Sequence, residues 1–65
     1  MIAISVSELK EMLLELEKEN IKVVEVSFLK EQEVEGEIVP ASLDFNGIDE
    51  NGNGMDFGEI EEVEE

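Results

Sequence analysis

Hydrophobic residues in the first third of the chain recur at intervals of three and four positions. This spacing is typical of the apolar stripe of an amphipathic helix. The residues that share it are Val6, Leu9, Met12, Leu13 and Leu16. The pattern predicts a helix over residues 6–19.

The residues at both ends of this segment support the same boundaries. Ser5 and Glu8 have the spacing of a capping box, in which the serine hydroxyl accepts a hydrogen bond from the glutamate amide. Ile4 and Leu9 flank the cap and are placed to form a hydrophobic staple. Asn20 suits a helix exit, because asparagine tolerates the left-handed conformation that often ends a helix.

From Ile21 onward the hydrophobic period changes from that of a helix to two. Val24, Val26 and Phe28 alternate with Glu25 and Ser27, and β-branched residues dominate. The alternation predicts a strand over 21–29, with its apolar residues on one face.

Two further strands are predicted beyond a charged segment at 30–37, which Gly36 marks as an exposed loop or a hairpin tip. In the first strand Ala41, Leu43 and Phe45 alternate with Ser42, Asp44 and Asn46, and Pro40 stands at its start. In the second, Met55 alternates with Phe57. The pattern leaves open whether 58–63 extends this strand or forms a helical turn.

These elements predict an α+β fold, in which one N-terminal amphipathic helix packs on a small three-stranded antiparallel sheet, a meander. A chain of 65 residues has room for one domain, which we expect to span 1–63, with a disordered acidic tail at 64–65.

The composition excludes several classes of chemistry. The chain has no cysteine, histidine or arginine, which removes thiolate nucleophiles, cysteine zinc sites and the commonest general base. We therefore expect a protein that is not an enzyme and that binds no cofactor, with calcium as the one candidate ion. No segment resembles a signal peptide or a membrane span, so we expect a cytoplasmic protein that does not bind membranes.

Charge is the strongest compositional feature, at a net −15 from nineteen acids and four lysines. Residues 1–30 hold all four lysines and six acids, whereas residues 31–65 hold thirteen acids and no base. Such a chain cannot bind a nucleic acid backbone directly, and its natural partner is a basic protein. Like charge also favours a monomer. Leu14, which lies off the helix stripe, and the sheet edges leave self-association open.

The acidic half contains two sets of candidate binding residues. In an extended segment, alternating carboxylates project on one side about 6.5–7 Å apart, close to two steps of the ~3.4 Å phosphate spacing of one DNA strand. This first row consists of Glu31, Glu33, Glu35 and Glu37. The residues expected to contribute to a second row are Asp44, Asp49, Glu50, Asp56, Glu59, Glu61 and Glu62.

A rigid array of this kind can imitate a nucleic acid and occupy the basic groove of a nucleic-acid-binding protein. In size and charge the chain is similar to phage-encoded DNA mimics that inhibit restriction, repair or CRISPR enzymes, without a shared motif. The alternative is a small structural domain whose charge only keeps it soluble.

The segment 49–60 carries a second pattern, oxygen-bearing residues at alternating positions followed by a glycine. Asp49, Asn51, Asn53 and Gly54 in this order resemble the calcium loop of the EF-hand family. The resemblance implies a calcium- or cation-responsive module with Asp49, Asn51, Asn53 and Glu59 as metal ligands. The chain departs from the family at the closing glutamate, since Glu59 arrives one residue early and no helix precedes the loop. The alternative is a hairpin loop.

Overall fold

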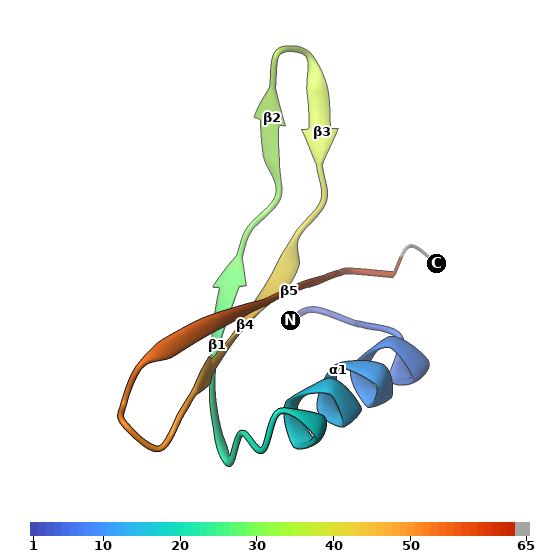
Figure 1. The fold of residues 1–65 in the computed structure, drawn as a ribbon. Helices are drawn as coiled ribbons and strands as arrows, with labels where there is room; N and C mark the ends of the chain where they lie inside the picture. The colour runs from blue at the N-terminus through green and yellow to red at the C-terminus, as the bar shows by residue number, and fades with distance from the viewer. Residues whose placement is uncertain (64–65) are drawn as a thin grey trace.

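The computed structural model describes residues 1–63 and has the predicted α+β architecture (Figure 1). The predicted tail at 64–65 lies outside the described residues. Strands β1, β4 and β5 form an antiparallel sheet in that order, and β2 and β3 form a separate two-stranded hairpin. The elements are α1 (Val6–Lys18), β1 (Val23–Leu29), β2 (Gln32–Val34), β3 (Glu37–Val39), β4 (Ser42–Ile48) and β5 (Gly54–Glu61).

Helix α1 begins and ends as its sequence predicts, within one residue. The amide of Glu8 donates to Ser5 Oγ over 3.3 Å, which caps the first turn. At the other end Asn20 adopts a φ of 59°, and the amide of Ile21 donates to the carbonyl of Leu16 over 2.9 Å. This Schellman closure brings Ile21 against Leu16, and both side chains are buried.

The three-stranded sheet is a meander with one face toward the helix. In antiparallel pairs, residues directly opposite each other share a face. Val26 lies opposite Phe45, and Leu43 opposite Ile60, so the predicted alternation in β1 and β4 is confirmed. Residues 58–61, left open by the sequence, continue β5 as strand.

The hydrophobic core is small and lies between α1 and the β4–β5 side of the sheet. No side chain is completely buried among the described residues, and the core consists of Leu16, Ile21, Ala41, Phe45 and Ile60. Helix α1 packs against β5, whereas the helix-side face of β1 is left largely uncovered. The expectation of a helix covering the sheet is therefore met on one half of the sheet only.

The β2–β3 hairpin projects from the sheet and makes the molecule elongated (Figure 1). Its turn residues Glu35 and Gly36 both have positive φ, of 52° and 81°, as a type I′ turn requires. The radius of gyration is 13.2 Å, against about 11 Å expected for a compact domain of this length. In the part of the chain that the structure describes, no helix has the length and apolar character needed to cross a membrane.

Candidate functional site: the acidic face of the sheet

The face of the sheet that points away from α1 carries a cluster of carboxylates. The strand register arranges the carboxylates of this face in three rows across β1, β4 and β5. These rows are Glu25–Asn46–Asp56, Ser27–Asp44–Glu59 and Leu29–Ser42–Glu61. We call the five carboxylates of these rows the acidic sheet face: Glu25, Asp44, Asp56, Glu59 and Glu61. Neighbouring strands are about 4.8 Å apart, so the carboxylates form a compact two-dimensional array.

No lysine lies within the three strands that form this face. Asp44 and Glu59 are directly opposite each other on β4 and β5, and like charges in that position destabilise a sheet. Glu59 Oε2 accepts a hydrogen bond of 3.2 Å from the buried hydroxyl of Ser42, which fixes the carboxylate on this face. The face therefore keeps a pair of negative charges that the fold itself does not favour.

A β-bulge shapes the β5 part of the face. The register shifts between Phe45 and Asn46 of β4, so that Asp56 lies opposite Asn46 and Gly58 opposite Phe45. Gly58 has a φ of 97°, and its amide donates to Asp56 Oδ1 over 2.9 Å. The bulge places Phe57 against Gly47 on the helix side and leaves Asp56 and Glu59 on the acidic sheet face.

The predicted row of glutamates at 31–37 is wrong as a single row, because the segment folds into a hairpin. Glu33 lies opposite Ile38, whereas Glu37 lies opposite Val34 on the other face of β2–β3. Glu35 occupies the turn itself. The four carboxylates remain exposed, but they point in different directions from a projecting hairpin.

The structure thus separates the candidate binding residues into two surfaces. Asp44, Asp56, Glu59 and Glu61 come together on the acidic sheet face, whereas the four glutamates of 31–37 lie on the β2–β3 hairpin. The other members of the predicted second row do not join the face, because Asp49 and Glu50 lie in the β4–β5 connection and Glu62 follows β5. Glu25 completes the sheet face and was not among the predicted site residues. The alternation of Glu25 with apolar residues was the available signal, but only the strand register shows that it adjoins the acids of β4 and β5.

The loop proposed to resemble an EF-hand is the hairpin connection between β4 and β5. Asp49 Oδ1 accepts hydrogen bonds of 2.9 Å from the amides of both Asn51 and Asn53. The amide of Gly52 donates to the carbonyl of Asp49, and the amide of Asp49 to the carbonyl of Asn53. This oxygen of the carboxylate is therefore used to close the turn, as the hairpin alternative predicts.

The structure does not bring the four proposed calcium ligands together. Glu59 lies opposite Asp44 on β5, about 15 Å along the strand from the loop that holds Asp49, Asn51 and Asn53. Within residues 1–63, no group of three or more acidic side chains has a geometry that could hold a metal ion. The predicted ligand set is wrong in its inclusion of Glu59, because an EF-hand-like loop requires a helix where this chain has β5.

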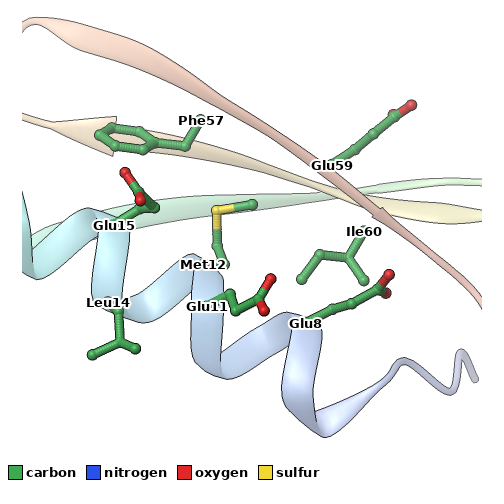
Figure 2. Close-up of a pocket in the computed structure, with 8 residues that line it drawn as sticks. All are labelled: Glu8, Glu11, Met12, Leu14, Glu15, Phe57, Glu59 and Ile60. Carbon is green, nitrogen blue, oxygen red and sulfur yellow. The ribbon is translucent and has the colours of Figure 1, made fainter.

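A groove of about 420 Å³ lies along the boundary between α1 and β5 and was not predicted from the sequence (Figure 2). Figure 2 shows Met12 and Ile60 lying between the two elements, while Leu14 points away from the sheet. Acidic side chains surround the apolar residues, and the full lining is Glu8, Glu11, Met12, Leu14, Glu15, Phe57, Glu59 and Ile60. Glu59 points away from the helix, so it lies at the border between this groove and the acidic sheet face (Figure 2).

The acidic sheet face and the neighbouring groove attract cationic groups and repel anions. The groove adds apolar contacts at its floor, which suit the aliphatic stem of a lysine or arginine side chain.

Comparison of the chain with protein-family models, with curated proteins and with solved structures finds no match. The geometry and charge of these surfaces are therefore what indicates a function.

Proposed function

We propose that this protein is a non-enzymatic binding module that engages a basic protein through its acidic sheet face. The observation that supports the proposal is the gathering of five carboxylates on one face of a three-stranded sheet without an intervening lysine. Opposite charge on a partner relieves the repulsion between Asp44 and Glu59, so binding recovers free energy that the isolated fold lacks.

The partner class that fits best is a nucleic-acid-binding protein, and its inhibition by mimicry is the corresponding action. Such proteins present clustered lysine and arginine side chains that are arranged to contact successive phosphates. A rigid sheet holds its carboxylates at fixed spacings, and a fixed array loses less conformational entropy on binding than a disordered acidic tail does. The proposed setting is the cytoplasm.

The test compares two triple variants that remove the same amount of charge from different surfaces. The first replaces the sheet-face residues, as Asp44→Asn, Glu59→Gln and Glu61→Gln. The second replaces hairpin residues, as Glu31→Gln, Glu33→Gln and Glu37→Gln. Each variant and the parent chain are immobilised, exposed to cell lysate and eluted with increasing salt.

We expect the parent and the hairpin variant to retain a basic nucleic-acid-binding protein that duplex DNA or RNA displaces, and the sheet-face variant to lose it. Loss from the hairpin variant alone would move the binding surface to β2–β3. A parent chain that retains no basic protein would contradict the proposal.

A further inference from the structure

Strand β1 forms an open edge of the sheet that lacks the usual protection against pairing. It is seven residues long, contains no proline, and pairs with β4 without a bulge. Its outer edge has no strand beside it in the described part of the chain. Natural edges are normally shortened, bulged, charged or covered, because exposed N–H and C=O groups recruit another strand.

The side chains of β1 are apolar and exposed on both faces. Four of its seven residues are large hydrophobic side chains with 42% to 60% of their surface exposed, namely Val23, Val26, Phe28 and Leu29. Val26 and Phe28 belong to the helix-side face, which α1 leaves uncovered next to β1. Beside them, a largely apolar groove of about 240 Å³ lies between β1 and the second half of α1, lined in part by Leu13 and Val24.

The total surface of the chain is too large for a compact monomer. Its accessible area is 5234 Å², whereas a folded monomer of 7.3 kDa exposes ~4,200 Å². The excess of about 1,000 Å² is more than the ~800 Å² that each partner buries in a typical stable interface. Both the projecting hairpin and the uncovered β1 expose large apolar side chains.

Charge distinguishes β1 from the rest of this acidic chain. The strand has one carboxylate, Glu25, and Lys22 and Lys30 flank it. Residues 22–30 therefore have two positive charges against one negative, although the whole chain has a net charge of −15. Two copies that meet at β1 avoid the acidic surfaces that otherwise keep them apart, and a strongly basic partner has no electrostatic reason to choose this edge.

From these observations we propose that two copies of the chain associate through β1, which pairs with itself in antiparallel orientation. A two-fold axis perpendicular to the sheet keeps the apolar faces on one side, and Val26 then lies opposite Val26 of the second copy. Val24 faces Phe28 of the second copy, and Glu25 faces its Ser27. Centring the pair on Glu25 instead would oppose two glutamates, which disfavours that register.

The dimer forms one six-stranded sheet with both acidic sheet faces on the same side and both helices on the other. Lys22 of each copy then lies opposite Lys30 of the other, just outside the paired strands, where the ammonium groups remain in water and salt screens their repulsion. This inference stands independently of the proposed partner. The two also differ in salt dependence, since salt screens repulsion between copies but weakens attraction to a basic protein.

Sedimentation equilibrium of the full chain tests the association. We expect the mass to rise with concentration toward twice 7.3 kDa, and association to be tighter at about 1 M salt, where the Debye length is about 3 Å. Phe28→Lys should weaken association by about tenfold or more, because it buries an unpaired charge against Val24. Ile38→Lys, at a similarly exposed position of the hairpin, should leave association unchanged.

Cross-linking tests the register, because the chain has no cysteine of its own. In the proposed dimer, the two Val26 residues have Cα atoms about 4.5–5.5 Å apart, within the range of a disulfide. The two Val24 residues are offset by four positions, or about 13 Å along the strands. Val26→Cys should form a disulfide-linked dimer on oxidation, and Val24→Cys should not.

Three results would overturn the proposal. The first is a parent chain that keeps the monomer mass at millimolar concentration and high salt. The second is a Phe28→Lys variant that folds, by circular dichroism, and associates as the parent does. The third is equal cross-linking of the two cysteine variants, or no cross-linking of Val26→Cys.

Discussion

The two edges of the three-stranded sheet are built in opposite ways. At the β5 edge, α1 packs over the strand, a bulge interrupts the register, and Asp56, Glu59 and Glu61 add negative charge. At the β1 edge the register is regular, the side chains are mostly apolar and α1 leaves most of them exposed. Each feature of β5 discourages the approach of another strand, and β1 has none of them apart from one glutamate and two flanking lysines.

The contrast indicates that the sheet has a protected edge and an edge available for contact. The net charge of the chain predicts a monomer, but the charge is concentrated on β5, on the hairpin and along α1 rather than on β1. Global charge is therefore a poor guide to association when one edge of the fold is nearly neutral. Four tests address the two sides of this comparison, beginning with the largest expected effect.

Removing apolar volume should cost far more stability beneath the helix than at the open edge. Ile60 on β5 is 4% exposed and Val26 on β1 is 50% exposed. Ile60→Ala should lower the free energy of unfolding by about 2–5 kcal/mol, close to the ~3–5 kcal/mol that a core of this size supplies. Val26→Ala should cost about 1 kcal/mol or less.

Urea denaturation at low protein concentration, where association is suppressed, measures both variants. Equal losses of stability would mean that β1 is as well packed as β5, which would remove the basis of the comparison. At high concentration Val26→Ala should show an additional loss, since the proposed dimer buries Val26 against its counterpart.

The next test concerns the contact between Gly47 of β4 and Phe57 of the bulged strand β5. A Cβ atom on Gly47 would lie 2.7 Å from Phe57 Cε1 and 3.1 Å from Ile21 Cγ2. Gly47→Ala should therefore destabilise the fold by about 1–3 kcal/mol through overpacking. Phe57→Leu removes the aromatic ring, so the double variant should recover part of the loss in thermal unfolding. If the free-energy loss of the double variant equals the summed losses of the two single variants, Phe57 does not lie over Gly47.

Local sequence patterns determine the helix and the strands of this fold, so these elements were predictable. The Ser5 cap, the Asn20 exit and the alternation of Val24, Val26 and Phe28 are each set by a few neighbouring residues, and the structure has them where the sequence predicts them. The strand continuation at 58–61 was open because the same residues suit a helical turn, and pairing with β4 decides between the two.

The candidate site was less predictable, because it depends on which residues become neighbours across strands. Alternation in the sequence puts Glu31, Glu33 and Glu37 on one side only if the segment stays extended, and the Glu35–Gly36 turn reverses it. Conversely, Glu25 and Glu61 are 36 positions apart along the chain, and no local pattern connects them. The bulge at Asn46 shifts the β5 partners once more, and periodicity cannot reveal such a shift.

The stability of the loop between β4 and β5 should depend on a single carboxylate, that of Asp49. Asp49→Ala removes the acceptor of two amide hydrogen bonds and should lower the free energy of unfolding by about 1–2 kcal/mol. Asp49→Asn keeps the Oδ1 acceptor and should cost less. Denaturation curves distinguish the two variants, and an equal loss in both would mean that the negative charge, rather than the turn geometry, is what the loop requires.

The smallest expected effect is a gain of stability on the acidic sheet face. Asp44→Asn removes the like-charge pair with Glu59 and should stabilise the fold by about 0.2–1 kcal/mol. Glu50→Gln, in the exposed loop, removes the same charge without a directly opposed acid and serves as the control. Thermal unfolding at low and high salt measures both, and the difference between the two variants should shrink as salt screens the pair. An equal gain in both variants would mean that total charge, rather than the Asp44–Glu59 pair, limits stability. A gain specific to Asp44→Asn, accompanied by weaker binding of a basic protein, would show that the Asp44–Glu59 pair lowers stability while it contributes to recognition. At β1, by contrast, the exposed apolar surface is proposed to bind a second copy.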